Sequence, residues 1–291
     1  MTDTLLPVDL LTATSPTPVT TPVCAVVVTR GRTPYLAATV AALAAQTRRP
    51  VRVLLVDVSD TGDEAVEQVL HSAFTAAGGT SMPALRVVRT PGARTFGHAV
   101  RRALEADDGL ATTWLWLLHD DSAPAPSALA ELVRAVSHAP SVAVAGVKQR
   151  TWTDPERLLE VGVRSSRSGR RMTDVEPGEL DQGQHDGRED VLGVGIAGAL
   201  VRRDVWTDLG GTDQLLGPFG DGFDLSRRTS APAIPTPSTS SRPSCCPWSS
   251  SPGSTSVIRR PERDERRPTS SNRSGSVHVR CLTPATATDG A

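Results

Sequence analysis

The feature that most constrains the fold is an unbroken apolar run, rich in β-branched residues, at residues 23–29 (VCAVVVT). A strand that is apolar on both faces belongs in a sheet covered on both sides, which is typical of parallel sheets. A helical pattern that begins with proline follows at 34–46, and a second buried strand follows at 51–58. This alternation predicts an α/β fold with a doubly wound, mostly parallel sheet.

The alternation continues further along the chain. We expect helices at 64–76, 97–106 and 126–137, and strands at 85–89, 113–118 and 142–147. Residues 151–188 are polar and weakly periodic, which indicates a hairpin and loops over the site. A strand at 190–201 and a short helix at 203–209 follow.

The two ends of the chain differ from the middle in composition. Residues 1–22 are rich in Thr and Pro, and we expect a disordered leader there. From Thr229 onward Ser, Pro, Thr and Arg dominate and apolar periodicity stops. We therefore expect a folded domain at 23–228, and a tail at 229–291 that cannot bury enough apolar surface to fold.

Two hypotheses account for this tail. It is either a natural disordered segment or the product of a frameshift after about residue 228. Back-translation of 229–246 with G/C-ending codons, read one nucleotide earlier, can encode HLGAGH followed by a valine-rich strand. This alternative sequence would supply the helix end, the turn and the strand that an α/β domain needs next.

Acidic residues follow two of the expected strands. Asp57 ends one of them, and Asp120 and Asp121 follow another. The carboxyl ends of parallel strands meet at one edge of the sheet, so these side chains should converge there with Thr29. Carboxylate oxygens at that edge can hold a divalent cation, which would neutralise a diphosphate. The alternatives are a helix N-cap for the acid pair and a turn cap for Asp57.

Two glycine-containing segments also suggest ligand binding. Arg94 and Gly97 lie at an expected helix start, where a guanidinium and backbone N–H groups can meet phosphate oxygens; the alternative is a surface loop. Residues 193–198 match GxGxxG but come late in the chain, whereas a dinucleotide fold places this motif after its first strand. We expect small residues there to allow close approach of a sugar or of backbone. Trp152 is a candidate for stacking on a sugar ring.

Bulk properties exclude several classes of protein. The net charge of −1 gives no electrostatic reason to bind nucleic acid. The four cysteines form no CxxC pair, which argues against a zinc knuckle or a disulfide scaffold. The N-terminus lacks the pattern of a signal peptide, and no apolar run reaches the ~18 residues of a membrane span. We expect a cytoplasmic protein, or one that is peripheral at the inner face of the membrane.

The ordered set of motifs resembles the family 2 glycosyltransferases of actinobacteria. The nucleotide-binding half is carried by VCAVVVTRGR, VRVLLVDVSDTG, RVVRTPGARTFGHAVRRAL and WLWLLHDDSAP. The acceptor half is carried by LLEVGVRSSRSGRR, EPGELDQGQHDGREDVLGVGIAGALVRRDVW and LGGTDQLLGPFGDGFDLSRR. The resemblance spans about 23–228 and implies a domain of the GT-A type, the nucleotide-diphospho-sugar transferase fold, incomplete at its C-terminal end.

The resemblance also implies roles for individual residues. Thr29, Asp57, Arg94, Gly97 and Asp120 would contact the nucleotide sugar. Asp120 and Asp121 would stand for the DXD metal motif and bind Mg²⁺ or Mn²⁺, with His119 where an acid is usual. Asp221 would be the catalytic base; many relatives have a second acid where this chain has Gly222.

The implied activity is inverting transfer of a sugar from a nucleotide-diphosphate donor to a hydroxyl of a glycan or lipid-linked acceptor. Cell-wall or polysaccharide synthesis is the expected setting. Two alternatives remain open: nucleotidyl transfer to a sugar phosphate, and a truncated pseudo-glycosyltransferase without activity.

Overall fold

The computed structural model describes most of the expected domain. The described residues are 21–60, 62, 64–79, 81–107, 111–168, 170–173, 175–186, 191–216, 220–230 and 278–282. The expected leader lies outside them, apart from residues 21 and 22. Most of the expected tail lies outside them too.

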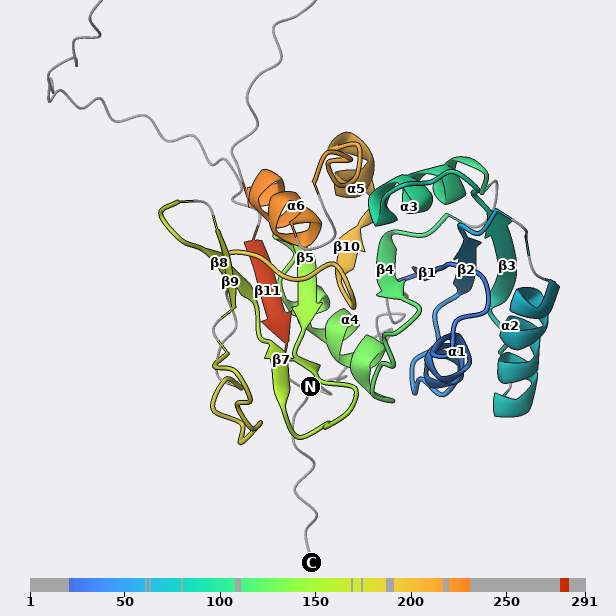
Figure 1. Cartoon of the computed structure of the whole chain (residues 1–291), viewed down its shortest axis with the longest axis horizontal. Helices are drawn as coiled ribbons and strands as arrows, with labels where there is room; N and C mark the ends of the chain where they lie inside the picture. Colours follow the sequence, from blue (N-terminus) through green and yellow to red (C-terminus); the bar gives the residue numbers. More distant parts are fainter. Residues whose placement is uncertain are drawn as a thin grey trace, which may run out of the picture.

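A seven-stranded sheet forms the centre of the described structure, in the order β11-β5-β10-β4-β1-β2-β3 (Figure 1). Its strands are β1 (Val23–Thr29), β2 (Arg52–Asp57), β3 (Ala84–Arg89), β4 (Trp114–His119), β5 (Val142–Val147), β10 (Leu200–Arg202) and β11 (His278–Leu282). Only β10 runs against its neighbours β4 and β5. The predicted α/β, mostly parallel sheet is confirmed.

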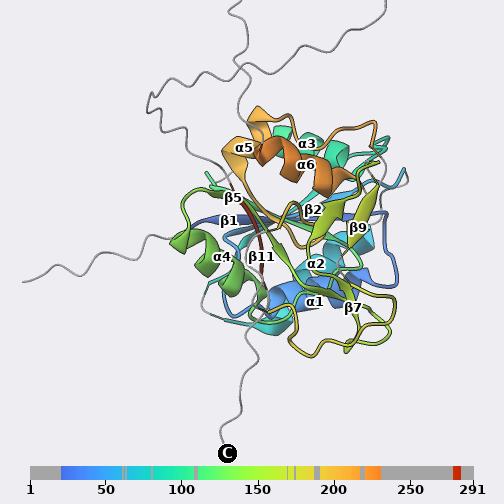
Figure 2. The same cartoon turned by 90° about the vertical axis from the view of Figure 1, so that its left-hand side faces the viewer.

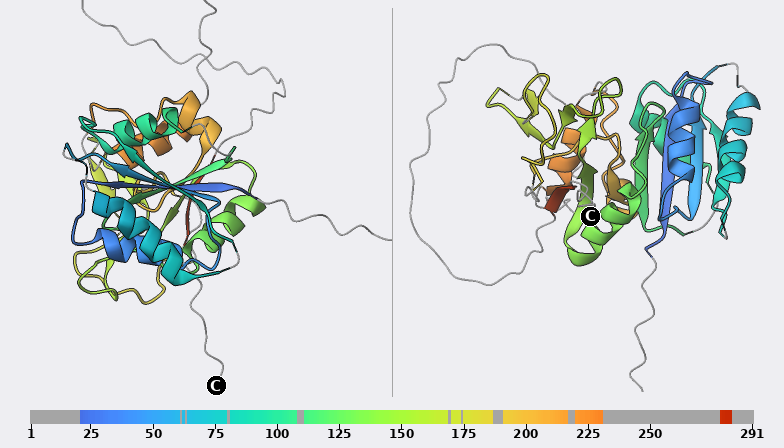
Figure 3. Two further views of the ribbon diagram at one scale, coloured as in Figure 1. Left: turned by 90° about the vertical axis from the view of Figure 1, so that its right-hand side faces the viewer. Right: turned by 90° about the horizontal axis from the view of Figure 1, so that it is seen from below.

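Helices cover both faces of this sheet. They are α1 (Leu36–Ala44), α2 (Glu64–Ala77), α3 (Phe96–Glu105), α4 (Ala128–His138), α5 (Arg203–Asp208) and α6 (Asp221–Ser230). Figure 2 shows α3, α5 and α6 together on one side and α1, α2 and α4 on the other. Figure 3 (left) shows the sheet nearly edge-on between these two layers.

The core consists of two apolar clusters, one on each face of the sheet. The side chains of β1 alternate between them: Val23, Ala25 and Val27 point to one cluster, and Cys24 and Val26 to the other. A continuous apolar run is what a strand needs when both of its faces are buried. The prediction that 23–29 is such a strand is therefore confirmed.

The polar middle segment forms short hairpins, as expected. Strand β6 (Gln149–Arg150) pairs with β7 (Leu158–Glu160), and β8 (Val163–Ser165) pairs with β9 (Arg171–Thr173). The strand predicted at 190–201 is mostly wrong. Residues 191–199 form an irregular loop, and only β10 at its end is a strand.

The C-terminal boundary also needs correction. Helix α6 continues past Arg228 to Ser230, and Thr229 is buried. Strand β11 lies inside the segment expected to be disordered and pairs in parallel with β5. Composition did not predict this strand, so the expectation of disorder does not hold at 278–282. For residues 231–277 and 283–291 it lies outside the described residues.

Candidate functional site

Asp57 ends β2 and is almost completely buried. Its Oδ1 accepts hydrogen bonds from the backbone N–H groups of Gly31 and Ser59, each at 2.9 Å, and its Oδ2 accepts from the Ser59 hydroxyl at 2.9 Å. The carboxylate therefore fixes the loop after β1 and the turn after β2, which is the turn-capping alternative. Direct contact with a nucleotide stays a prediction.

Thr29 joins the ends of three strands. It lies beside Asp57 in the register of β1 and β2, and its hydroxyl is 2.9 Å from Asp120 Oδ2. The hydroxyl of Thr39 in α1 donates to the Asp120 carbonyl at 2.7 Å. The structure thus brings Thr29, Asp57 and Asp120 together at the carboxyl edge of the sheet, as their strand-end positions predict.

Asp121 is the exposed member of the acid pair. Among the described residues its carboxylate has no hydrogen-bond or ion-pair partner, so both oxygens are available to a ligand. Within the same part of the chain, no group of three or more His, Cys, Asp or Glu is arranged to hold a metal ion. A divalent cation at this acid pair would therefore need further oxygen ligands from a diphosphate or from water.

His119 lies between the acid pair and the start of α3. Its ring packs against Phe96, with the ring centres 4.6 Å apart. Its Nε2 is buried and has no hydrogen-bond partner among the residues that the structure describes. A buried polar atom of this kind is uncommon in folded proteins and needs a partner such as water or a ligand.

Arg94 and Gly97 flank the start of α3. Arg94 is exposed, and Thr95 caps the helix by accepting a hydrogen bond from the His98 N–H at 3.2 Å. Gly97 is buried, and a Cβ there would lie 1.8 Å from Thr212 Oγ1. The glycine is thus explained by close packing of α3 on the 212 segment, while phosphate contact by either residue stays a prediction.

Asp221 lies in the first turn of α6 and is only 6% exposed. Burial raises the pKa of Asp221, although the Gly222 N–H, 2.8 Å from Oδ1, and the nearby charges of His119 and Arg171 oppose the shift. The backbone of Gly222, the next residue, packs against the loop at 194–196, which leads into β10 from the carboxyl edge of the sheet. A buried carboxylate with a raised pKa is a candidate proton acceptor.

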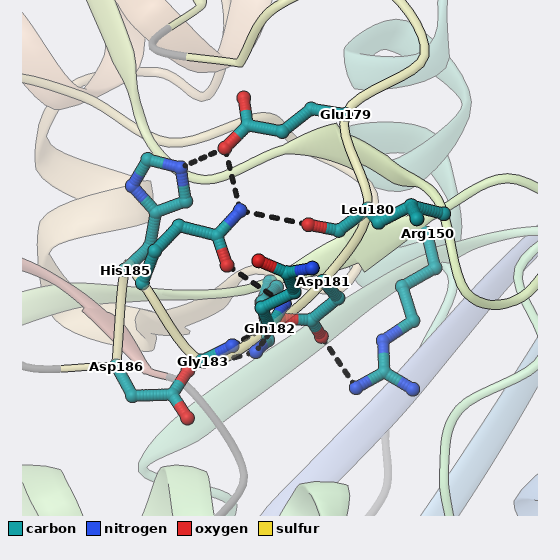
Figure 4. Close-up of polar contacts among 10 residues, drawn as sticks. Arg150, Glu179, Leu180, Asp181, Gln182, Gly183, His185 and Asp186 are labelled. Atoms are coloured by element: carbon teal, nitrogen blue, oxygen red, sulfur yellow. Dashed lines mark hydrogen bonds and ion pairs between the residues drawn. The ribbon is translucent and has the colours of Figure 1, made fainter.

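A cluster of ion pairs, which sequence reasoning missed, holds the segment 175–186 against the sheet (Figure 4). Lys148, whose side chain is 2% exposed, donates to Asp181 and Asp186 at 2.8 Å each. Arg150 pairs with Asp181 at 2.5 Å. The sequence signal was present: Lys148 is the only lysine, and DQGQHD carries both acids.

Trp152 follows β6 and is 47% exposed. Its ring packs edge-on against that of Tyr35, just before α1, with centres 5.3 Å apart. The pair connects the α1 side of the sheet edge with the hairpin of β6 and β7. An exposed aromatic pair can stack on a ligand, and sugar stacking by Trp152 stays a prediction.

Comparison with known proteins identifies the family of this chain. The sequence profile described as "Glycosyltransferase like family 2" matches residues 21–238, more than half of the chain. The chain therefore belongs to glycosyltransferase family 2. It is also 30% identical over 217 residues to galactofuranosyltransferase GlfT1 of Mycolicibacterium smegmatis, an alignment that covers 73% of this chain and 67% of that protein.

Two solved structures match part of the chain. The mannosyltransferase PcManGT of Pyrobaculum calidifontis, in complex with GDP-Man and Mn²⁺, matches with a TM-score of 0.48 at 18% identity, over 72% of this chain and 50% of that one. Staphylococcus aureus TarS 1-349 with UDP-GlcNAc matches with a TM-score of 0.47 at 13% identity, over 70% and 52%. The chain thus spans about half the length of these structures. The sheet order and the family together confirm the predicted GT-A-type fold.

No helix in the described part of the chain is long and apolar enough to cross a membrane.

Proposed function

We propose that this protein transfers a sugar, with inversion, from a nucleoside-diphosphate donor to a hydroxyl of a glycan or lipid-linked acceptor. The observation that carries the proposal is the meeting of the strand-end residues Thr29, Asp57 and Asp120 at the carboxyl edge of the sheet. The candidate base is the buried Asp221 in the first turn of α6, which packs on the loop that enters β10 from that edge. Similarity to the mycobacterial galactofuranosyltransferase makes a nucleoside-diphosphate galactofuranose the first donor to test. Cell-wall or polysaccharide synthesis is the proposed setting.

The donor would lie along the carboxyl edge of the sheet. The end of β2 with Asp57 suits the nucleoside, and the end of β4 suits the diphosphate. Asp121, with a free carboxylate, and Asp120, with one oxygen already engaged by Thr29, would hold a Mg²⁺ or Mn²⁺ ion together with diphosphate oxygens. When bound, such an ion neutralises charge on the leaving diphosphate.

The chemical step would be a single displacement at the anomeric carbon. Asp221 accepts the proton of the acceptor hydroxyl as the acceptor oxygen bonds to that carbon. The bond from the same carbon to the diphosphate oxygen breaks, and the nucleoside diphosphate leaves. The new bond forms on the face opposite the leaving group, so the configuration inverts. The buried position of Asp221 supports this role, because a raised pKa makes the carboxylate a better proton acceptor.

The test is metal-dependent nucleotide binding. Calorimetry should show that UDP or GDP binds more tightly with Mn²⁺ or Mg²⁺ present, and that Asp121→Ala abolishes this increment. Asp208→Ala, at an exposed acid of α5, is the matched control and should behave as wild type. Equal affinity with and without metal would remove the cation from the proposal. Release of pyrophosphate from a nucleoside triphosphate and a sugar phosphate would replace it with nucleotidyl transfer.

A further inference from the structure

Glu160 is a buried acid to which the proposed reaction gives no role. It ends β7 and is only 4% exposed. Its Oε1 accepts a hydrogen bond from the Gly195 N–H at 2.6 Å, and its Oε2 forms an ion pair with Arg171 of β9. Burial raises the pKa of Glu160, and Arg171 and the Gly195 N–H oppose that rise. A carboxylate that is buried and bound on both oxygens connects the segments that carry its two partners, and in this sense Glu160 is a structural junction.

This junction fixes the loop at 193–197. A Cβ on Gly195 would lie 2.5 Å from Glu160 Oε1 and 3.0 Å from Gln149 Nε2, so the backbone fills the space between the two side chains. Gln149 also donates to the Ala197 carbonyl at 2.9 Å. Residues of the β6–β7 hairpin therefore hold the loop at two points, Gly195 and Ala197.

The same loop supports the first turn of α6. A Cβ on Gly222 would lie 2.5 Å from the Val194 carbonyl oxygen and 2.6 Å from the Ile196 nitrogen. The Val194 N–H donates to the Ser226 hydroxyl at 3.2 Å, which in turn donates to the Gly222 carbonyl at 2.8 Å. Movement of the loop would therefore move Asp221, which precedes Gly222.

We propose that Glu160 is a positioning residue for Asp221, because it fixes the 193–197 loop on which the first turn of α6 rests. The inference rests on the proposed role of Asp221 as the base. It also explains why glycine stands at 222, where many relatives have an acid, because any side chain there would meet the loop backbone. A displacement of about 1 Å at a reacting group can lower the rate on the order of 100-fold.

The kinetic test compares Glu160→Ala with Glu160→Gln. Alanine removes both contacts, and we expect kcat to fall on the order of 100-fold while the donor KM changes less than about twofold. Glutamine can still accept from Gly195, so it should restore much of the rate. Glu176→Gln, at an exposed acid of the same half, is the control and should match wild type. A rise in KM at constant kcat, or full activity of Glu160→Ala, would overturn the proposal.

A second measurement does not depend on activity. Amide exchange in Glu160→Ala should quicken at 193–197 and in the first turn of α6, and stay unchanged in α4, whereas Glu160→Gln should resemble wild type. Unchanged exchange at 193–197 and 221–226 in Glu160→Ala would overturn the proposal. If Glu160→Ala does not fold, Gly195→Ala is expected to give the same pattern.

Asp221→Asn separates this inference from the proposed function. Full activity in that variant would remove Asp221 as the base and leave the loop contacts intact. Loss of activity in Asp221→Asn together with full activity in Glu160→Ala would remove only the positioning role.

Discussion

The nucleotide half and the acceptor half hold their polar residues at the sheet edge by different means. In the nucleotide half, Asp57 is bound by Gly31 and Ser59, in the loops that directly follow β1 and β2. In the acceptor half, Lys148 and Glu160 form ion pairs with other charged side chains, those of Asp181, Asp186 and Arg171. At the sheet edge, the carboxylates of the first half are thus bound by backbone N–H groups and hydroxyls, whereas those of the second half are bound by charged side chains. Removal of one of these ion pairs should therefore alter the acceptor half and leave nucleotide binding intact.

The largest expected effect tests the chemistry of the acceptor half. Asp221→Asn should lower kcat by about 10²–10⁴-fold, the usual contribution of a general base. Nucleotide affinity should stay within about twofold of wild type, because the nucleotide would contact the other half. Steady-state transfer assays and calorimetry would measure both. A parallel loss of nucleotide affinity would show that the two halves are not separable.

The next effect concerns the sequence after about residue 228. We predict that this chain is a poor catalyst, because the resemblance to the family implies a further helix, a strand and a late His beyond this point. Restoring the alternative reading frame should raise the transfer rate on the order of 100-fold. Both proteins would be assayed for donor hydrolysis and sugar transfer. Equal rates would refute the frameshift hypothesis and assign a role to the present tail.

A smaller effect is expected from the ion-pair cluster of Figure 4. Lys148→Met leaves Asp181 and Asp186 without the ammonium, and we expect a loss of about 3 kcal/mol in the free energy of unfolding. Arg150 still pairs with Asp181, which keeps the loss at the lower end for a buried pair. Urea denaturation would measure it.

The control for that prediction is Arg134→Met, which removes an exposed partner of Glu131. It should change the free energy of unfolding by less than about 1 kcal/mol. Similar losses in Lys148→Met and Arg134→Met would contradict the view that buried charges hold the acceptor half.

The smallest effect is on the pH dependence of stability. Burial raises the pKa of Asp221, so folding favours its protonated form. Its contribution to stability is therefore present below the ordinary aspartate pKa and is lost as pH rises through the raised value. At neutral pH, Asp221→Asn should unfold at a slightly higher temperature than wild type, and at acidic pH the difference should vanish. Thermal scans across pH would show whether the inactive variant is the more stable one.

The sequence predicted the nucleotide half well because its signals are local. An apolar run such as 23–29 identifies a buried strand, and the strand-end rule places Thr29, Asp57 and Asp120 together without knowledge of any contact. The structure brings these strand ends together and shows Asp57 bound to its own turn, while their contacts with a ligand stay predictions. Local patterns were sufficient because each functional group directly follows an element whose direction is known.

The acceptor half could be predicted only in outline. The continuous apolar residues at 191–199 predict a strand, but the structure has a loop there. Its glycines allow close packing: a Cβ on Gly193 would meet Phe223, and one on Gly195 would meet Glu160. The partners of Glu160 and Lys148 depend on how two hairpins fold back, and no periodicity encodes that. Strand β11 falls on a short alternation of polar and apolar residues, HVRCL at 278–282, which is a strand pattern that the Ser, Pro, Thr and Arg excess around it conceals.

Strand β10 runs antiparallel to its neighbours, and this limits how relatives of the chain can vary in length. The strand pairs with β4 through only three residues, Leu200 to Arg202, and the 191–199 loop enters it from the carboxyl edge. One residue inserted in that loop would either shift β10 by one position, which turns every side chain to the opposite face, or push the loop off Gly222. We therefore expect insertions and deletions to be rare at 193–202 and common in the turn between β8 and β9. Evolution can thus reshape the acceptor half through its hairpins while this short stretch keeps its length.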